Sequence, residues 1–471
     1  MKMSSLAVRS PIAAVLLSVS VSFPAMLLAH DDHTHEKPEP VAEKDAYPVT
    51  AIPERIVLTW KDDPVTTQAV TWRTDTSVQH PVAQIALAED GPLFVPKAKE
   101  IAATATLVKT DLGERNYHAA HFTGLEPDTL YVYRVGDGTN WSAWNHFRTA
   151  SDEPVPFSFI YFGDAQNRVK EHCSRVFREA FSDAPRARFT LHAGDMINRG
   201  NRDAEWGEWY DAAGWVNAML PMICIPGNHE YDINRVDPPP EEVGKDVRHL
   251  SRRWDERFEY PENGPAGLQE KAKETAYYLD YQGVRIIAMN SMEEYSIQAR
   301  WLESVLADNP NRWTVVTHHH PVYSASERRD NPELRAAWQP LYDKYRVDLV
   351  LQGHDHSYGR TGLMAYEGKP IKNVSVGRRA QRRKAGTLYV VSVSGPKLYG
   401  RSKFEFDRRA EDTQLYQIIT VDGDELRYKA HTATGELYDA FTLRKQRGRL
   451  INQLINEIPD KPENRRPDKK K

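Results

Sequence analysis

The sequence predicts an α/β domain preceded by a small all-β sandwich domain. From about residue 48 to 150, short apolar runs alternate with polar residues and are separated by Gly, Pro and Asp, a pattern typical of a β-sandwich. From 155 to 447, β-branched runs alternate with segments whose apolar residues recur every three or four positions, as in βαβ units. A chain of 471 residues is long enough for two or three domains.

The first 29 residues predict a secretory signal peptide. Lys2 and Arg9 precede an apolar stretch, and Ala29 offers a cleavage site. Several serines and Pro24 interrupt this short apolar span, which disfavours a stable membrane anchor. We therefore expect an exported protein, periplasmic or secreted. Residues 30–47 are polar and aperiodic, and we expect them to form a flexible linker.

The all-β domain predicted for residues 48–150 has strand patterns at 55–60, 68–74, 83–88, 117–125, 129–136 and 142–149. The last two, with the turn before them, resemble the final strands of a fibronectin type III-like domain. Tyr131 and Tyr133 are expected to pack in its core and at its corner. No combination of residues in this domain suggests catalysis.

Four amphipathic segments between residues 171 and 345 predict helices, and the apolar runs between them predict a largely parallel sheet. The polar, proline-rich stretch from Tyr231 to Glu274 predicts an excursion that forms one wall of an active site. Residues 448–471 end in a basic, proline-containing stretch, and we expect them to form a charged tail.

Bulk composition excludes several classes of protein. The 62 basic and 66 acidic residues give a net charge of −4, so no overall basic character indicates a nucleic acid partner. Cys173 and Cys224 are the only cysteines, which excludes a disulfide-rich scaffold and predicts two small buried side chains. The sequence also lacks a G-x-S-x-G nucleophile motif and a glycine-rich phosphate-binding loop.

Seven potential metal ligands follow five of the apolar runs that are predicted to be strands. Strands that end at the same edge of a sheet would bring these side chains into one crevice. Each motif alone has an ordinary explanation, such as a turn or a capping residue, but their combination in this order favours a metal site. The seven residues are Asp164, Gln166, Asp195, Asn228, His319, His354 and His356.

Two adjacent metal ions need a bridging carboxylate within a set of oxygen and imidazole ligands. We expect Asp195 to bridge the ions, with Asp164 and His356 completing the first one. The second ion would be completed by Asn228, His319 and His354. His229, next to Asn228, is then free to donate a proton to a leaving oxygen. Asp195 and His229 are therefore the predicted catalytic residues.

The motifs GD, GD, GNHE, VxxH and GHxH resemble those of the calcineurin-like metallophosphoesterase superfamily. The β-domain, with RIVLTWKDDP and AVTWRT, is similar to that of purple acid phosphatases. The resemblance implies a four-layer αββα sandwich behind a fibronectin type III-like domain. It also implies the ligand sets given above, selects His319 among the three histidines of VTHHHP, and assigns His229 to the leaving group.

Two positions depart from the purple acid phosphatase pattern. Asn198 stands where the family has a tyrosine that binds ferric iron, and Gln166 stands where it has a glycine. An amide oxygen is a weaker donor than a phenolate, so a pair of divalent ions becomes more favourable than a pair containing ferric iron. It stays open whether Gln166 or Asn198 takes the place of the tyrosine, and whether the two ions are Fe, Mn or Zn.

We therefore predict an exported dinuclear-metal phosphoesterase, similar to acid phosphatases, that hydrolyses phosphate monoesters of phosphorylated small molecules. Hydroxide held between the two ions would attack phosphorus. Two alternatives remain: a phosphodiesterase or nucleotidase that uses the same site, and a secreted binding protein that has no activity and works through its β-domain. The sequence indicates no oligomeric state.

Overall fold

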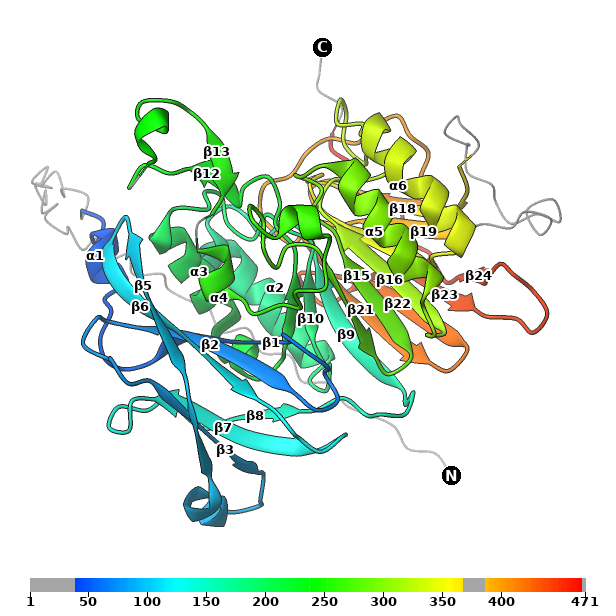
Figure 1. The fold of residues 1–471 in the computed structure, drawn as a ribbon. Helices are drawn as coiled ribbons and strands as arrows, with labels where there is room; N and C mark the ends of the chain where they lie inside the picture. The colour runs from blue at the N-terminus through cyan, green and yellow to red at the C-terminus, as the bar shows by residue number, and fades with distance from the viewer. Residues whose placement is uncertain (1–38, 237, 252, 367–385, 468–471) are drawn as a thin grey trace, which may run out of the picture. The chain divides into compact units, whose positions relative to one another are not determined.

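The computed structural model of the protein describes residues 39–467 except 237, 252 and 367–385. Residues 43–471 belong to one compact unit. Within its described residues, this unit contains two four-stranded sheets, two seven-stranded sheets and one two-stranded sheet (Figure 1). The predicted signal peptide at 1–29 lies outside the described residues. So does the first part of the predicted linker, whose last residues form a short helix, α1 (Glu43–Ala46).

The N-terminal domain is the β-sandwich that its sequence pattern predicts. One sheet has the strand order β1-β2-β6-β5 and the other β4-β3-β7-β8, and Trp72, Phe122 and Phe147 pack in the core of the domain. The bounds are β1 (Glu54–Thr59), β2 (Gln68–Thr74), β3 (Val82–Leu87), β4 (Lys99–Ala102), β5 (Thr104–Thr110), β6 (Gly113–Phe122), β7 (Leu130–Gly136) and β8 (Asn145–Arg148). Strands β4 and β5 were not predicted, because most of their side chains are exposed and no apolar alternation marks them.

Tyr131 and Tyr133 of β7 both lie in the core of this sandwich. The backbone N–H of Glu126 donates to the Tyr131 hydroxyl (2.9 Å), which closes a tyrosine corner of the kind that the sequence predicts. The Tyr133 hydroxyl donates to the carbonyl of Ala218 (2.7 Å), in the domain that follows. Tyr131 therefore stabilises the sandwich alone, whereas Tyr133 also joins the sandwich to the larger domain.

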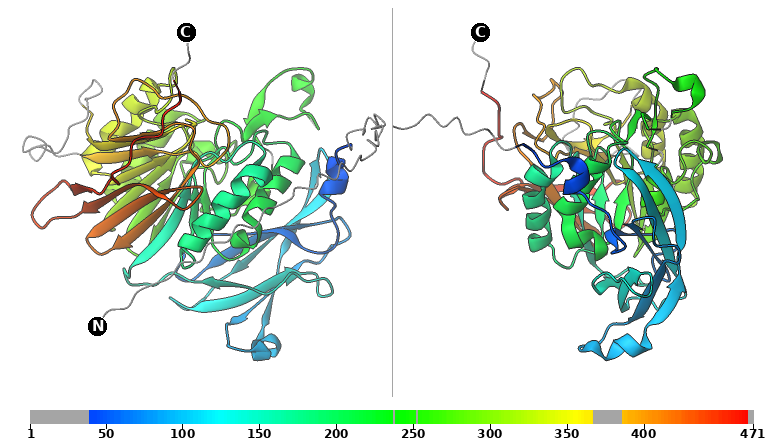
Figure 2. Two further views of the ribbon diagram at one scale, coloured as in Figure 1. Left: turned by 180° about the vertical axis from the view of Figure 1, so that it is seen from behind. Right: turned by 90° about the vertical axis from the view of Figure 1, so that its left-hand side faces the viewer.

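The larger domain has four layers (Figures 1 and 2). One seven-stranded sheet has the order β11-β10-β9-β21-β22-β23-β24, and the other has the order β14-β15-β16-β17-β19-β18-β20. Their strands are β9 (Phe157–Phe162), β10 (Thr190–His192), β11 (Met222–Cys224), β14 (Tyr277–Tyr281), β15 (Val284–Ala288), β16 (Trp313–His318), β17 (Leu349–Gln352), β18 (Tyr358–Met364), β19 (Thr387–Val391), β20 (Arg408–Ala410), β21 (Leu415–Asp422), β22 (Glu425–Thr432), β23 (Leu437–Arg444) and β24 (Gln453–Asn456). The main helices are α2 (Val169–Asp183), α3 (Asp203–Ala213), α5 (Tyr295–Ala307) and α6 (Pro332–Tyr345).

Alternate side chains of the central strands separate these layers. Ile286 of β15 packs in the large cluster that includes residues of β9 and β21. Its neighbour Ile287 packs instead with Leu302 of α5 and Trp338 of α6. Helix α2 covers the other outer face, where Phe177 contacts Phe162 of β9 (ring centroids 4.7 Å apart). Because a strand presents successive side chains to opposite faces, this alternation builds the αββα sandwich that the resemblance implies.

The prediction of a largely parallel sheet is wrong. Only the strands β9–β11 in one sheet and β15, β16, β17 and β19 in the other pair in parallel within the described residues. The remaining strands of both sheets pair antiparallel. Strands β21 and β22 are joined by a tight turn at Gly423, which has a φ of +55°. A turn this short permits only antiparallel pairing.

The predicted start of the charged tail at residue 448 is wrong, because folded structure continues beyond that residue. Strand β24 lies inside the predicted tail and pairs with β23 at the edge of the first seven-stranded sheet. Farther on, the backbone N–H of Asn464 donates to the Tyr438 hydroxyl (2.9 Å), and its carbonyl accepts from the N–H of Glu411 (2.9 Å). The chain as far as Asn464 is therefore attached to the domain through backbone groups, which composition alone does not reveal.

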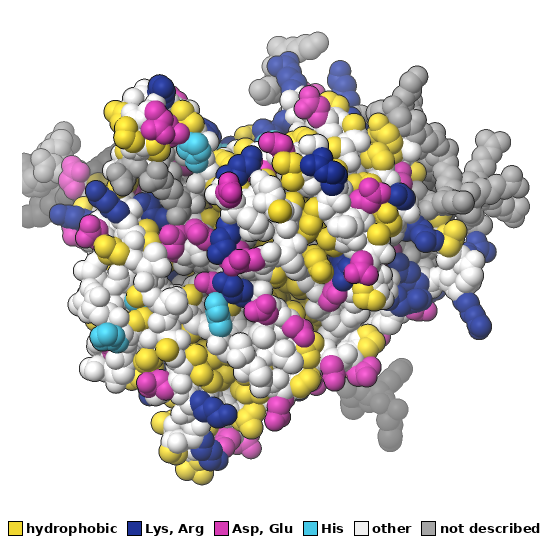
Figure 3. Space-filling view, viewed as in Figure 1, with side chains coloured by type: hydrophobic (Ala, Val, Ile, Leu, Met, Phe, Trp, Pro, Cys, Tyr) yellow, Lys and Arg dark blue, Asp and Glu magenta, His cyan; other side chains and the backbone are white. Residues whose placement is uncertain are grey.

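Two bulk features agree with the composition. Cys173 and Cys224 are buried free thiols. On the face shown in Figure 3, basic and acidic side chains are interspersed, without an extended patch of one charge. Among the residues that the structure describes, no helix combines the length and the apolar character needed to cross a membrane.

A buried ionic network joins the sandwich to the larger domain. Asp203, at the first position of α3, accepts hydrogen bonds from Arg55 of β1 (2.9 Å) and Arg73 of β2 (2.6 Å). The guanidinium of Arg257 lies 3.6 Å from the same carboxylate. Burial would raise the pKa of Asp203, but the three arginines outweigh it and hold the pKa well below its usual range. The two domains thus share a charge cluster from which water is excluded.

Candidate metal centre

The predicted ligands lie where strands of both seven-stranded sheets end. Asp164, Asp195 and Asn228 follow β9, β10 and β11 of the first sheet. His319 directly follows β16 of the second sheet, and the two histidines of the GHDH motif follow β17. Because these strands are the parallel ones, their carboxyl ends meet at one edge. The site therefore draws on both sheets.

Glycines beside the ligands let the backbone segments come this close. A Cβ atom added at Gly227 would lie 2.2 Å from Asp195 Oδ1, and one at Gly353 would lie 2.3 Å from Asp164 Oδ1. A Cβ atom at Gly163 would lie 1.9 Å from the carbonyl oxygen of Ser392. Any larger residue at these positions would displace a ligand carboxylate or a neighbouring strand.

Two of the ligand residues adopt backbone conformations that are unfavourable for residues with a Cβ atom. Asp195 has a φ of +50° and His354 a φ of +71°, which costs about 1–2 kcal/mol for each residue. Hydrogen bonds compensate this strain: the N–H of Asp195 donates to Glu230 Oε2 (2.9 Å), and the N–H of His354 donates to Asp164 Oδ1 (2.6 Å). Strain of this kind concentrates at functional sites.

The side chains form two groups that share one carboxylate. Asp195, His319 and His354 offer ligand atoms that all lie within 4.8 Å of one another, and so do Asp164, Asp195 and His356. Asp195 belongs to both groups. This is the arrangement expected of a carboxylate placed between two ions.

Asn228 completes the group formed by Asp195, His319 and His354. Its Oδ1 atom lies 2.9 Å from His354 Nδ1 and 3.3 Å from His319 Nε2. The amide oxygen thus faces the same point as the two imidazole nitrogens. An uncharged oxygen ligand is useful here, because a further carboxylate would add negative charge to a buried site that already contains two.

Backbone carbonyls fix the tautomers of two histidines. His319 Nδ1 donates to the carbonyl of Ala193 (2.8 Å), so that Nε2 faces Asp195 Oδ2 at 3.2 Å. His356 Nδ1 donates to the carbonyl of Lys397 (2.6 Å), so that Nε2 faces Asp164 Oδ2 at 3.4 Å. Metal-binding histidines commonly use one ring nitrogen in this way to orient the other.

His354 is held differently. Its Nε2 atom lies 2.6 Å from the Nη2 atom of Arg329, and a guanidinium can only donate a hydrogen bond. The proton of the neutral imidazole is therefore on Nδ1, directed at Asn228 Oδ1. A cation bound by Nδ1 must displace this proton, as is usual when metal binding is coupled to proton release.

Gln166 lies among the ligand atoms of the other group, formed by Asp164, Asp195 and His356. Its Nε2 atom is 2.8 Å from Asp195 Oδ2 and 3.2 Å from His356 Nε2. Within the described part of the chain, its Oε1 atom and Asp164 Oδ2 are buried without a hydrogen-bond partner. Rotation of the amide by 180° would exchange its nitrogen and oxygen and bring the oxygen beside Asp195 Oδ2 and His356 Nε2. The donor set thus fits a metal ion.

The electrostatics of the centre also favour bound positive charge. Asp164 and Asp195 are 0% and 1% exposed. Burial and the charge of Asp195 raise the pKa of Asp164 well above its usual range. Burial would lower the pKa of His319, but the two carboxylates outweigh it and raise that pKa to about 9. Without an ion, the carboxylates therefore keep a proton on the imidazole that faces them.

His229 lies at the edge of this centre. Its backbone N–H donates to Asp195 Oδ1 (2.9 Å), and its ring Nδ1 donates to the carbonyl of Asn198 (2.5 Å). The other ring nitrogen, Nε2, lies 3.9 Å from Asp195 Oδ2, and the side chain is 20% exposed. One nitrogen is thus anchored, while the other is accessible beside the shared carboxylate.

Comparison with known proteins supports the family resemblance. Residues 53–149 match the purple acid phosphatase N-terminal domain, and residues 157–358 match the calcineurin-like phosphoesterase domain. Acid phosphatase type 7 of Mus musculus is 30% identical over 339 residues, which cover 65% of this chain and 70% of that protein. The chain belongs to the calcineurin-like phosphoesterase family.

Two further comparisons show other proteins that the chain resembles. An uncharacterised protein of Mycobacterium tuberculosis is 28% identical over 333 residues, and the alignment spans 63% of this chain and 60% of that protein. The purple acid phosphatase PPD1 from yellow lupin seeds has a similar fold, with a TM-score of 0.67 at 17% identity over 84% of this chain and 75% of the lupin chain.

The chain contains two positioning carboxylates that the sequence analysis did not predict. Glu230 is fully buried and accepts backbone hydrogen bonds from Gly227 (2.7 Å), Asp195 and Met196 (both 2.9 Å). Asp355 accepts hydrogen bonds from the backbone N–H groups of Ala325 and Ser326 and from the side-chain hydroxyl of Ser324. Each directly follows a predicted site residue, Glu230 after the proposed acid His229 in GNHE and Asp355 after the ligand His354 in GHDH. An acidic residue at that place in both motifs was the available signal.

Tyr358 and Arg360, which follow the GHDH motif, are engaged elsewhere. Arg360 binds both carboxylate oxygens of Asp439 (3.0 Å each), and the Tyr358 hydroxyl donates to the same carboxylate (2.7 Å). Asp439 belongs to β23 and Arg360 to β18, so this buried ion pair joins the two sheets. These residues hold the two seven-stranded sheets together behind the metal centre.

Proposed function

We propose that this chain is a dinuclear metal-dependent phosphoesterase that hydrolyses phosphate monoesters of small molecules. The observation that carries the proposal is that Asp195 belongs to two groups of ligand atoms, each within 4.8 Å. Mononuclear sites do not need a shared carboxylate, whereas two-metal hydrolases do. Membership of the calcineurin-like phosphoesterase family supports the same reaction class.

When bound, a pair of metal ions supplies the positive charge that neutralises phosphoryl oxygens and makes a water molecule nucleophilic near neutral pH. Asp164, Gln166 and His356 would hold one ion, and Asn228, His319 and His354 the other. Asp195 would bind both. In the reaction, the water oxygen bonds to phosphorus, the bond from phosphorus to the ester oxygen breaks, and His229 Nε2 gives its proton to that oxygen.

Gln166 is the better candidate to take the place of the tyrosine ligand. Its amide lies beside Asp195 Oδ2 and His356 Nε2. Asn198 instead offers its backbone carbonyl to His229 Nδ1, where it orients the proposed acid. With an amide in place of a phenolate, we propose a pair of divalent ions, drawn from Fe, Mn and Zn.

The proposed setting is export to the periplasm or the medium, which rests on the sequence of residues 1–29. A phosphodiesterase or nucleotidase would use the same ligands, because the two-metal chemistry is shared and the shape of the pocket selects the substrate. A binding protein without activity is disfavoured, because it has no need for seven converging ligands or for tautomers fixed by Ala193 and Lys397.

The test is reconstitution of the purified chain with Mn, Zn, Fe or Co, followed by elemental analysis and assay with p-nitrophenyl phosphate. We expect two ions per chain and metal-dependent turnover. Asp195→Asn should lose both ions and activity, while Asp211→Asn, a change on the exposed face of α3, should retain them. Less than one ion per chain together with no turnover would refute the proposal.

A further inference from the structure

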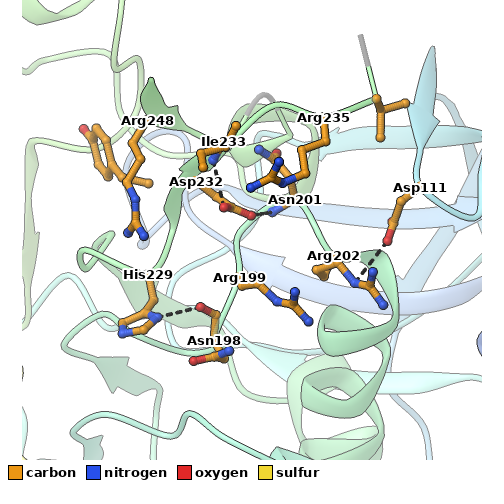
Figure 4. A pocket seen from close by; sticks show the side chains of 12 residues that line it. Asp111, Asn198, Arg199, Asn201, Arg202, His229, Asp232, Ile233, Arg235 and Arg248 are labelled. Carbon is orange, nitrogen blue, oxygen red and sulfur yellow. Dashed lines mark hydrogen bonds and ion pairs between the residues drawn. The ribbon is translucent and has the colours of Figure 1, made fainter. Parts of the chain in front are cut away.

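One cavity of the structure belongs to the proposed metal centre. It has a volume of about 400 Å³ and lies beside His229, between the loop at 198–202 and a hairpin formed by β12 (Tyr231–Ile233) and β13 (Arg248–Leu250) (Figure 4). This hairpin is part of the excursion from Tyr231 to Glu274 that the sequence predicts to lie against an active site. A ligand in this cavity would contact His229, so the cavity is part of that centre and not a separate site.

A larger cavity, of about 810 Å³, lies where the sandwich meets the larger domain. Its walls are residues of β7 and β8 from the sandwich, together with residues at or just before the starts of β9, β10 and β11 from the larger domain. The proposed metal ligands follow the carboxyl ends of the same three parallel strands. The cavity therefore lies at the opposite edge of the sheet, about 20 Å away along a six-residue strand such as β9.

Hydrogen bonds fix the walls of this larger cavity. In the loop before β10, the N–H of Arg188 donates to the carbonyl of Ser158 at the start of β9 (2.8 Å). The segment before β11 is held against the sandwich by the hydrogen bond from the Tyr133 hydroxyl to the carbonyl of Ala218 (2.7 Å). The cavity is therefore formed before any ligand binds, as is usual for small-molecule sites.

The walls carry an excess of positive charge. Among the fifteen lining residues, three are arginines (Arg148, Arg186 and Arg188) and none is acidic. Asp128, which lies outside the lining, accepts a hydrogen bond from Arg148 Nε (2.7 Å) and lies 3.6 Å from Arg188 Nη2, so one carboxylate serves two arginines. Arg186 is exposed and has no ion pair with any residue that the structure describes. A bound anion would supply the missing negative charge.

Most of the remaining lining is apolar. Nine of the fifteen lining residues are apolar, among them Phe157, Met219 and Leu220, so much of the wall offers no hydrogen bond to a hydrated ion. Leu130 of β7 is 40% exposed and lies directly opposite Arg148 of β8. Because residues opposite each other in an antiparallel pair share one face, an apolar and a cationic side chain lie together in this wall.

We infer that this larger cavity binds a free long-chain carboxylate, with its head group on the arginines and its alkyl chain along the apolar lining. A guanidinium binds a carboxylate through two hydrogen bonds, and each buried CH₂ group strengthens binding by about fourfold. A small inorganic anion would leave the apolar lining uncovered, and a neutral lipid would leave Arg186 without a counter-charge. Binding there does not depend on the reaction at the metal centre.

This ligand would contact both domains at once. Leu130 and Arg148 belong to the sandwich, whereas Arg186 and Met219 belong to the larger domain. A ligand that binds the folded chain and not the unfolded chain stabilises the fold. Binding should therefore raise the midpoint of thermal unfolding.

The test is isothermal titration calorimetry of the purified full chain, with unbound metal removed, using dodecanoate below the concentration at which it forms micelles. We expect one molecule per chain and a raised Tm. Octanoate has four fewer CH₂ groups, so its Kd should be higher by about tenfold or more. Arg186→Glu should raise the Kd for dodecanoate by about tenfold or more, because it replaces an arginine that has no counter-charge by a repelling carboxylate.

Two variants serve as controls, and both should keep the Kd of the wild type. Arg300→Glu makes the same charge change on the exposed face of α5, and Arg248→Glu makes it in the cavity beside His229. Absence of saturable binding, or an unchanged Kd in Arg186→Glu, overturns the inference. Equal affinity for the neutral dodecyl maltoside overturns the role of the arginines, and equal affinity for acetate overturns that of the alkyl chain; either result refutes the site as inferred. None of these outcomes bears on the phosphoesterase function, which metal-dependent turnover tests separately.

Discussion

The chemistry of the proposed site depends on individual ring nitrogens. His229 has one nitrogen bound to the carbonyl of Asn198 and the other accessible near Asp195. His319 and His356 are held by backbone carbonyls so that Nε2 of each faces a carboxylate. At the scale of single residues, backbone carbonyls therefore orient the rings of two proposed ligands and of the proposed acid.

Replacing His229 with alanine should separate metal binding from catalysis. None of the proposed ligand atoms is removed, so the variant should bind two ions like the wild type. Loss of a general acid should lower kcat by about 10²–10⁴-fold for an alkyl phosphate, whose leaving oxygen needs a proton. The loss should be smaller with p-nitrophenyl phosphate, because nitrophenolate leaves without one. Elemental analysis and steady-state kinetics measure both effects, and unchanged turnover of the alkyl ester would disprove the assigned role.

At the scale of secondary structure, the ends of parallel strands position the ligands, and the flanking elements hold those ends in place. Glu230 and Asp355 tie the loops together through backbone hydrogen bonds. The antiparallel strands and the Arg360–Asp439 ion pair join the two sheets behind the centre. Asp203 at the start of α3 attaches the N-terminal sandwich through Arg55 and Arg73.

Replacing Asp203 with asparagine should destabilise the protein strongly. The change leaves Arg73, which is 0% exposed, without its buried counter-charge. Removing one partner of a buried ion pair costs about 3–5 kcal/mol. The control is Asp211→Asn on the same helix, which breaks an exposed pair with Lys170 and should cost less than about 1 kcal/mol. Urea unfolding measures both, and equal small effects would show that the network does not stabilise the domain contact.

At the scale of the whole molecule, stability should depend on buried neutral histidines. His118 in the sandwich and His192 in the larger domain are 1% and 2% exposed. Burial lowers the pKa of His118 to about 4 and that of His192 to about 3. Below the ordinary pKa of about 6.5, the unfolded chain takes up protons that the folded protein excludes. The free energy of unfolding should therefore fall as the pH is lowered from about 6.5 towards 4.

The contribution of His118 can be isolated by the change to glutamine. Between pH 7.5 and pH 5, a group whose pKa falls from 6.5 to about 4 on folding accounts for about 2 kcal/mol of lost stability. His118→Gln should lose about that much less than the wild type over the same interval, as measured by urea unfolding at both pH values. His146→Gln, an exposed change in the same domain, should behave like the wild type. An unaltered pH dependence in His118→Gln would contradict the role of this histidine.

Much of the arrangement could be predicted from local patterns. Apolar runs followed by Gly and a polar residue located the strand ends from Asp164 to His356, and amphipathic spacing located the main helices. The order of the β9, β10 and β11 segments along the chain was enough to expect their ends at one edge, because parallel strands joined by helices are neighbours. These features depend on residues close together in the sequence.

Other features depend on contacts between distant segments, and sequence patterns do not contain them. The antiparallel flanks of both sheets, strand β24 and the exposed strands β4 and β5 follow from pairing partners that lie elsewhere in the chain. The tautomers of His319 and His356 depend on the carbonyls of Ala193 and Lys397, and the cavity beside His229 depends on where the β12–β13 hairpin lies. The sequence by itself determined which side chains are available and which elements carry them. Only the tertiary structure decided which atoms face one another, because hydrogen-bond geometry and the exclusion of water arise when distant segments pack together.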